Sequence, residues 1–413
     1  MNKVKLGDLL EIRRGTTLPS KYYSKTGLRK RLTLGNFNYP NGGFKENTSK
    51  EDIFFIGDVK PEYILKKDDI ITPLTEQVHG LLGETARIPL DDVYVQSGDI
   101  GLVIPNSNKL DNKFAYYLIS SPVVKKQLSA GAQQTKIRHT SPDKIKDCQV
   151  YLPDLSNQKK IGVLLNNIDH KIKINNKIND ELEAMAKTIY DYWFLQFEFP
   201  NEEGKPYKSS GGKMVWNEEL KREIPEGWDL CTIEDISICH DAKRIPLSNK
   251  EREQMKGAIP YYGATGIMDY VNQYIFDGDY VLIAEDGSIM NDDGSPILQR
   301  ISGKTWVNNH AHILEPIDNY SCKLLMMILK DIPVVTIKTG SIQMKINQKN
   351  LNKVKIVSIP DNLKNRINRI LNDIDKKILL NKKESQELTS LRDFLLPLLM
   401  NGQVGFKGDK AEG

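Results

Sequence analysis

The chain has 413 residues, of which 27% are charged and 39% hydrophobic, and its formal net charge is +4. This is the composition of an ordinary globular protein, and the length exceeds what one compact core usually holds, so we expect two globular units. No segment resembles a signal peptide or reaches the roughly 20 apolar residues of a membrane span, which argues against an integral membrane protein and predicts a cytosolic one.

The first predicted unit covers residues 1–153 and mixes short strands with helix. Strands are expected at Ile100–Ile104 and Gln149–Leu152, and a helix at Lys113–Leu128. The unit holds 23 Lys and Arg residues against 17 Asp and Glu, and tyrosines interrupt its early basic run. That run consists of Arg13, Arg14, Lys21, Lys25, Arg29, Lys30 and Arg31. Such a run is either a solvated face or a surface that binds a phosphate backbone, and the sequence leaves both open.

A long helix is expected next, over residues 154–200, in which apolar residues recur at alternating steps of four and three. This heptad stripe is narrow, as in helices that pair with another helix. It runs through Ile161, Leu165, Ile168, Ile172, Asn175, Asn179, Leu182, Ala186, Ile189 and Trp193. Residues 201–224 are rich in Gly, Ser, Lys and Glu and predict an exposed linker.

A second mixed unit is expected over residues 225–360, then a second long helix over 361–405 and a tail over 406–413. The second unit has 14 Lys and Arg against 17 Asp and Glu, so it is not basic as a whole. Any polyanion that it binds must therefore contact a local basic patch or the positive charge of a partner protein. The second helix repeats the stripe of the first with an offset of 206 residues, at Ile367, Leu371, Ile374, Ile378, Asn381, Ser385, Leu388, Arg392, Leu395 and Leu399.

The simplest way to bury both stripes is to pack the two helices against each other, antiparallel, as a coiled coil. Asn175 and Asn381 hold equivalent positions and would fix the register, because a slipped pairing leaves amides facing leucine or isoleucine. The alternative is that each helix covers only its own neighbouring unit. The expected interface comprises Ile161, Leu165, Ile168, Ile172, Asn175, Leu182, Ile189, Ile367, Leu371, Ile374, Ile378, Asn381, Leu388 and Leu395.

The two globular units also open and close alike. Leu6–Ile12 resembles Ile233–Ile238, and Gly131-Ala-Gln-Gln-Thr-Lys-Ile137 resembles Gly340-Ser-Ile-Gln-Met-Lys-Ile346. Two copies of one plan predict an α+β fold with a pseudo-twofold internal repeat, in which two long antiparallel helices separate two mixed α/β domains.

Catalytic motifs are missing from the sequence. There is no G-x-x-x-x-G-K-[ST] loop, no G-x-G-x-x-G, and no Asn/Asp-Pro-Pro-Tyr/Phe of the kind that amino-methyltransferases use. Alternation along a strand would put His310 and His312 on one face, but no carboxylate or cysteine stands at ligand spacing beside them, so no metal site is predicted. Asp58 and Lys60 match a nuclease pattern only weakly. The 4 cysteines stand singly and indicate no disulfide framework or structural zinc.

Several strings, in this order, resemble the specificity (S) subunits of type I restriction-modification systems. They are Ile259-Pro-Tyr-Tyr-Gly-Ala-Thr-Gly266, Tyr274-Ile-Phe-Asp-Gly-Asp-Tyr-Val-Leu-Ile283 with Glu285-Asp-Gly287, and Trp306-Val-Asn-Asn-His-Ala-His312. The opening Pro225-Glu-Gly-Trp228 and the helix strings Asn167-Ile-Asp-His-Lys-Ile172 and Asp373-Ile-Asp-Lys-Lys-Ile378 are similar as well. The first unit lacks a Tyr-Tyr-Gly-Ala segment, which fits two domains that read different sequences.

The resemblance implies two target recognition domains, each reading one half of a split, asymmetric site in double-stranded DNA. It implies no catalysis by this chain and no membrane. Its partners would be two modification (methyltransferase) subunits docked on the helices and, through them, restriction subunits that act as ATP-dependent translocases and endonucleases. S-adenosylmethionine, ATP and magnesium would bind those partner subunits, not this chain.

The candidate DNA-binding residues are polar, basic or aromatic side chains in predicted loops. In the first domain they are Arg29, Arg31, Gln77, His79, Gln134, Lys136 and Arg138; in the second they are Tyr261, Tyr262, Thr265, Asn308, Asn309, His310 and Lys345. Gln134, Lys136 and Lys345 belong to the repeated closure, which favours a structural role, because domains with different targets should not share readers. Two rival interpretations stay open: a DNA-modifying or DNA-cutting enzyme with an unrecognised site, and a coiled-coil adaptor that binds no nucleic acid.

Overall fold

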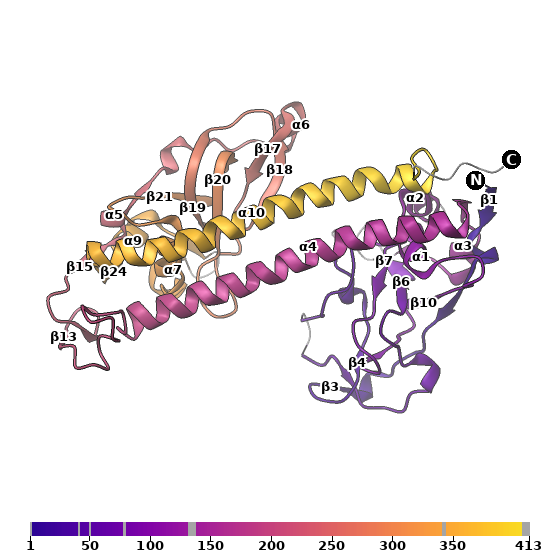
Figure 1. The fold of residues 1–413 in the computed structure, drawn as a ribbon, viewed down its shortest axis with the longest axis horizontal. Helices are drawn as coiled ribbons and strands as arrows, with labels where there is room; N and C mark the ends of the chain where they lie inside the picture. The colour runs from indigo at the N-terminus through magenta and orange to yellow at the C-terminus, as the bar shows by residue number, and fades with distance from the viewer. Residues whose placement is uncertain are drawn as a thin grey trace. The chain divides into compact units, whose positions relative to one another are not determined.

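The computed structural model describes residues 2–39, 42–48, 51–76, 80–130, 138–340 and 344–406 (Figure 1). The chain divides into two compact units, the first made of Met1–Asn175 and Lys383–Gly413 and the second of Asn176–Lys382. Two long helices, α4 (Leu155–Tyr190) and α10 (Asp361–Met400), contribute residues to both units. Each unit is therefore a globular domain together with one stretch of each helix.

The first domain is built on short strands. Their bounds are β1 Asn2–Lys5, β2 Leu10–Arg14, β3 Tyr23–Ser24, β4 Lys30–Arg31, β5 Phe54–Phe55, β6 Ile70–Pro73, β7 Thr75–Glu76, β8 Ala86–Arg87, β9 Tyr94–Val95, β10 Ile100–Pro105, β11 Arg138–His139 and β12 Gln149–Leu152. A central antiparallel sheet has the order β2-β10-β6-β8, and a second sheet has the order β3-β5-β4-β9. Strands β10 and β12 lie where the sequence predicts them.

The helices of the first domain are α1 (Asn112–Ile119), α2 (Pro122–Ala130) and α3 (Pro142–Lys146). Helix α1 begins where the Asp111 carboxylate accepts a hydrogen bond from the amide of Phe114. The single helix predicted over Lys113–Leu128 is wrong, because the chain forms two helices there. Pro122 has no amide hydrogen and disfavours a helical conformation at the residue before it, so one helix ends and another begins.

The second domain contains a larger sheet. Its strands are β13 Met214–Asn217, β14 Arg222–Pro225, β15 Leu230–Thr232, β16 Ser237–Cys239, β17 Lys256–Tyr262, β18 Ile267–Val271, β19 Phe276–Ala284, β20 Leu298–Val307, β21 Ala311–Pro316, β22 Lys338–Thr339, β23 Lys345–Ile346 and β24 Lys355–Val357. Six of them form one sheet in the order β16-β21-β19-β20-β17-β18. Its helices are α5 (Ile233–Ile236), α6 (Asn249–Gln254), α7 (Cys322–Lys330), α8 (Val334–Ile337) and α9 (Gln348–Asn352).

The segment expected as a linker, residues 201–224, is mostly exposed but is not featureless. Strands β13 and β14 pair as an antiparallel hairpin at its end. The ring of Phe199 stacks between Tyr207, at a centroid distance of 4.7 Å, and Trp228, at 5.0 Å. These aromatic contacts give the segment a fixed path, which its polar composition does not indicate.

In the first unit, the beginning of α4 packs against the end of α10. Ile161 and Leu165 of α4 share one core with Leu399 and Met400 of α10 and with the buried face of α1. The Asp169 carboxylate accepts hydrogen bonds from Arg392 of α10 at 2.9 Å and from the Tyr117 hydroxyl of α1 at 2.6 Å. The helix pair and the domain are thus joined by one apolar core and one shared carboxylate.

In the second unit, the end of α4 packs against the beginning of α10. Ala186 of α4 shares a core with Ile367, Leu371 and Ile374 of α10 and with α7. Asp375, which stands 206 residues after Asp169, accepts a hydrogen bond from Arg300 of β20 at 3.0 Å. Because early α4 pairs with late α10 and late α4 with early α10, the helices are antiparallel.

Buried amides in the helix pairs form hydrogen bonds at equivalent places. In the second unit, the Asn381 amide donates to the Asn179 side-chain oxygen at 2.9 Å. In the first unit, Asn175 donates to Glu384 at 2.8 Å and to Ser385 at 3.3 Å. With the offset of 206 residues, Asn175 corresponds to Asn381 and Asn179 to Ser385. Every residue of the interface predicted above is buried or half-buried.

These observations confirm an α+β fold with two mixed domains and a pair of long antiparallel helices. In the described part of the chain, no helix combines the length and the apolar character that a membrane crossing needs. The four cysteines are free thiols, two of them buried.

Candidate nucleic-acid interface

The basic run of the first domain is divided between two sheets, because Arg13 and Arg14 lie in β2 whereas its other five residues lie in or beside β3 and β4. Several of its charges are paired within the protein. Arg31 is only 7% exposed. Its guanidinium lies 3.9 Å from the centre of the Tyr23 ring and 3.0 Å from a carboxylate oxygen of Asp52. Arg29 is half-buried, and its side chain has no hydrogen bond or ion pair among the described residues. The contacts indicate a structural role for Arg31 and leave Arg29 as an available cation.

Five other predicted residues of the first domain are not placed together by the structure. Gln77, His79, Gln134 and Lys136 lie outside the described residues. Arg138 is described only in its backbone, which forms β11 and pairs with β7.

In the second domain, Tyr261 and Tyr262 are the last residues of β17, and residues 263–266 form the loop to β18, so the expectation that both tyrosines lie in a loop is wrong. Tyr261 is buried: its hydroxyl accepts a hydrogen bond from the Leu247 amide at 3.0 Å, and Arg252 lies over its ring. Tyr262 is half-buried, whereas Thr265 in the loop is exposed. Of these three candidates, Thr265 is therefore the one most accessible to a ligand.

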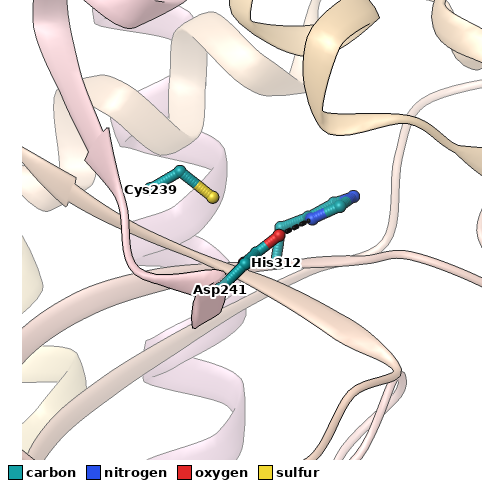
Figure 2. A group of neighbouring side chains, drawn as sticks. All are labelled: Cys239, Asp241 and His312. Carbon is teal, nitrogen blue, oxygen red and sulfur yellow. Dashed lines mark hydrogen bonds and ion pairs between the residues drawn. The ribbon is translucent and has the colours of Figure 1, made fainter. Parts of the chain in front are cut away.

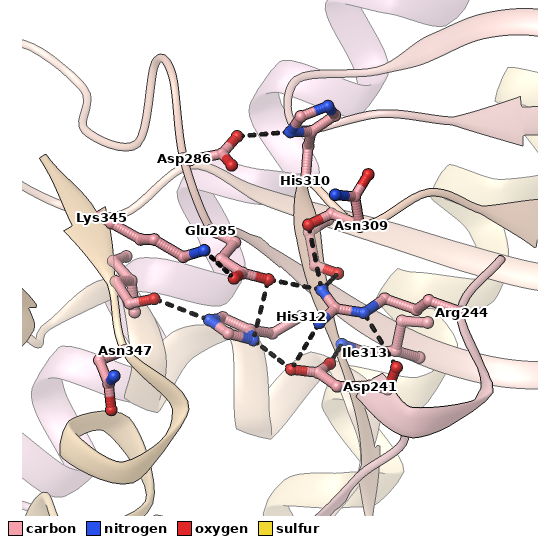
Figure 3. A network of polar contacts seen from close by, with 12 residues as sticks. Asp241, Arg244, Glu285, Asp286, Asn309, His310, His312, Ile313, Lys345 and Asn347 are labelled. Carbon is pink, nitrogen blue, oxygen red and sulfur yellow. Dashed lines mark hydrogen bonds and ion pairs between the residues drawn. The ribbon is translucent and has the colours of Figure 1, made fainter. Parts of the chain in front are cut away.

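The Asn308–His312 segment differs from its predicted geometry. His310 precedes β21 and is exposed, whereas His312 lies within β21 and is buried, so the expectation that one strand face carries both histidines is wrong. His310 pairs with the Asp286 carboxylate at 2.6 Å, and the buried Asn308 side chain accepts a hydrogen bond from the His310 amide. Asn309 is exposed, with its carbonyl toward Arg244 (Figure 3).

A network of charged side chains supports this segment from below (Figure 3). Arg244 bonds Glu285 at 2.6 Å and Asp241 at 3.2 Å, and Lys345 pairs with Glu285 at 2.7 Å. Burial raises the pKa of Glu285, but the bonds from Lys345 and Arg244 outweigh it and hold that pKa below its ordinary value. The pKa of Asp241 is lowered too, because bonds and charges from His312 and Arg244 outweigh its burial. The network thus supports this segment through paired opposite charges.

Lys345 belongs to this support. It comes from the repeated closure of the domain, and the strand that it begins, β23, also forms a bridge between Lys345 and Asp286. Its ammonium group is committed to Glu285, which agrees with the structural role that its repetition favours.

Cys239, Asp241 and His312 present three metal-type ligand atoms within 4.8 Å of one another (Figure 2). The fold brings a carboxylate and a thiol to His312 from β16 and the turn after it, which the sequence spacing does not reveal. However, both ring nitrogens of His312 already have hydrogen-bond partners, Nδ1 with the Asp241 carboxylate at 2.5 Å and Nε2 with the Ile346 carbonyl at 3.0 Å, so a cation would have to displace one of them. Burial and the charge of Asp241 raise the pKa of the Cys239 thiol to about 12.

With Arg244 already beside Asp241, the cluster fits a hydrogen-bonded network better than a cation site. Asp58 is not a member of any cluster of three or more metal-type side chains in the described residues. The weak nuclease pattern at Asp58 and Lys60 therefore gains no three-ligand cluster from the described residues.

The exposed face of the second domain also holds residues that the sequence reasoning missed. Ile267, Met268 and Tyr270 of β18 are exposed, and so is Tyr274, over whose ring Lys304 lies at 4.7 Å. Their signal in the sequence is apolar residues on both faces of a strand, whereas the contact with Lys304 of β20 depends on the fold. The arrangement combines a rigid polar support with an accessible aromatic and basic surface, which suits binding of a polyanion with flat bases.

Comparison with known proteins agrees with this arrangement. Residues 1–184 and 225–390 match the family described as type I restriction modification DNA specificity domain. The MjaIX type I restriction enzyme specificity subunit of Methanocaldococcus jannaschii is 24% identical over 348 residues, which cover 78% of this chain and 76% of that protein. The HindI specificity subunit of Haemophilus influenzae is 21% identical over 380 residues, covering 76% of this chain and 82% of that protein.

The fold is shared as well. The crystal structure of the S subunit of a type I restriction-modification system from M. genitalium is 18% identical, with a TM-score of 0.57 and coverage of 97% of this chain and 96% of that chain. The chain belongs to the type I restriction modification DNA specificity domain family, carries that domain twice, and is a specificity subunit of a type I restriction-modification system.

Proposed function

We propose that each globular domain reads one half of a bipartite, asymmetric site in double-stranded DNA and that the chain itself catalyses no reaction. The observation that carries this proposal is the duplication: one plan occurs twice, with equivalent long helices but a different loop sequence. A second copy with the same loops would read a symmetric site, whereas the first domain lacks the Tyr-Tyr-Gly-Ala loop of the second. Methylation and cleavage then belong to partner subunits, which bind S-adenosylmethionine, ATP and magnesium.

The two helices supply the docking surface for two copies of a modification subunit. Besides its buried stripe, α4 exposes Ile174 and Met185, which are eleven residues or about three turns apart and so share one face. Leu380 and Leu391 of α10 stand 206 residues later and are exposed too. A single exposed apolar residue on a protein surface needs no explanation. Two exposed apolar pairs at equivalent positions of an internal repeat do, and they suit a partner protein of which two copies bind, one at each pair.

The experiment is reconstitution of the chain with its modification subunits. Native mass spectrometry counts the subunits, and sequencing of methylated DNA gives the recognised sequence. We expect two modification subunits per chain and methylation of a split site whose halves differ. Methylation by the modification subunits of the same sequence without this chain would contradict the proposal.

Helix variants test the docking surface. Ile174→Asp with Met185→Asp should remove one modification subunit, and Leu380→Asp with Leu391→Asp the other, because a charge replaces an apolar contact at each site. Val335→Asp, at an exposed position of α8, is the matched control and should leave the count at two. Two bound subunits in both helix variants would refute these positions.

A further inference from the structure

The first domain carries three exposed apolar side chains beside the adjoining ends of three strands of its second sheet. Tyr22 directly precedes β3, Leu28 stands two residues before β4, and Ile56 directly follows β5. The Phe55 amide donates to the Arg29 carbonyl and the Ile56 amide donates to the Tyr22 carbonyl, so the three backbone segments are neighbours. The ring of Tyr22 also contacts that of Phe55, at a centroid distance of 5.9 Å. We call Tyr22, Ile56 and Leu28 the apolar stripe.

The apolar stripe is unusually accessible. Leu28 is 93% exposed, Ile56 61% and Tyr22 37%. On a half-buried sheet, an apolar residue that faces the core is ordinarily followed by a polar residue that faces solvent. Phe55 is buried, yet the residue that follows it, Ile56, is both apolar and exposed. In Figure 1, β3 and β4 lie at the end of the first unit that is remote from α4, so packing on the helices does not explain the stripe.

The charges around the apolar stripe favour nucleic acid over protein as its ligand. Residues 12–45 contain no Asp or Glu. The Lys21 ammonium lies 4.8 Å from the centre of the Tyr22 ring and pairs with no carboxylate in the described residues. Two nearby acids are paired, Glu51 with Lys25 and Asp52 with Arg31. The exposed Asp58, two residues after Ile56, is itself followed by the exposed Lys60.

The second unit repeats this combination independently. Tyr274 is exposed beneath Lys304, and Met268 and Tyr270 are exposed on β18. Each domain thus has a tyrosine beside a lysine, with exposed apolar side chains nearby.

We propose that the apolar stripe of Tyr22, Ile56 and Leu28 contacts base edges in the first half-site while Lys21 binds a flanking phosphate. Apolar side chains recognise the thymine methyl group in the major groove and insert between base steps in the minor groove, and an adjacent ammonium group fixes the register on the backbone. The proposal rests on the proposed function and assigns it to a surface.

The test uses the complex assembled with its modification subunits. The variant Leu28→Ser/Ile56→Ser removes two stripe side chains, and Leu90→Ser, at a 54% exposed leucine of the same domain outside the stripe, is the matched control. Both should unfold at the wild-type temperature, because the altered residues are exposed. The stripe variant should lose about tenfold in affinity for the site, as for a mismatched base pair, and its methylated sequence should become degenerate in the first half only.

Two results would overturn the assignment. One is a stripe variant with wild-type affinity and an unchanged methylated sequence. The other is a stripe variant that no longer assembles with the modification subunits in the absence of DNA, because the stripe would then be a protein interface. If the wild-type complex itself shows no sequence preference, the proposed function fails, and that outcome is separate from both.

Discussion

The hydrogen bond between Asn381 and Asn179 allows a quantitative test of the helix pairing. Both side chains are buried in the second unit, and the bond length is 2.9 Å. Replacing Asn381 by Leu leaves the Asn179 amide buried without this partner, at a cost of about 1–3 kcal/mol. In a unit of roughly 200 residues, where each kcal/mol shifts the melting temperature by about 2–4 °C, we expect Asn381→Leu to lower Tm by about 2–12 °C.

The reciprocal variant and the double variant give this prediction its control. Asn179→Leu should cost a similar amount, whereas Asn179→Leu/Asn381→Leu should recover most of the loss, since replacing both partners by apolar groups of like shape is nearly neutral. Calorimetry of the three variants measures the coupling. If the losses in the double variant simply add, to within about 0.5 kcal/mol, the two amides do not interact and the reasoning is refuted.

Three further predictions concern the charged residues. Arg300→Leu should destabilise the second unit by about 3–5 kcal/mol, measured by thermal unfolding, because it leaves the buried Asp375 carboxylate without its cation. The pKa of Glu285 is lowered from 4.5, so its stabilisation is complete above that pH and is lost as the pH falls through the folded value; Glu285→Gln should flatten the decline in Tm below pH 4.5. Arg31→Ala should lower Tm by several degrees, whereas Arg29→Ala should leave Tm unchanged and weaken DNA binding of the assembled complex, measured by titration.

The helices were the most predictable part of the chain. A heptad stripe is local information, and its recurrence after 206 residues links two distant segments without any knowledge of the fold. Helix α10 spans Asp361–Met400, within the expected range of 361–405 but five residues shorter. The break between α1 and α2 also has a local cause in Pro122, which the periodicity of the surrounding residues conceals.

The candidate interface was less predictable because it depends on contacts between strands. Tyr261 looks like an accessible aromatic in the sequence, yet its hydroxyl is held by the Leu247 amide and its ring is buried. His310 and His312 are two residues apart, but a turn separates their environments. The apolar stripe depends on the register of β3 and β4 on β5, which no single segment encodes.

The central claim is that each domain independently reads one half of the site and that catalysis lies elsewhere. The most direct measurement exchanges residues 1–153 for the corresponding domain of another specificity subunit, keeps the same modification subunits, and sequences the methylated DNA. The account predicts that one half of the methylated sequence changes and the other half stays the same. A change in both halves, or in neither, would contradict it.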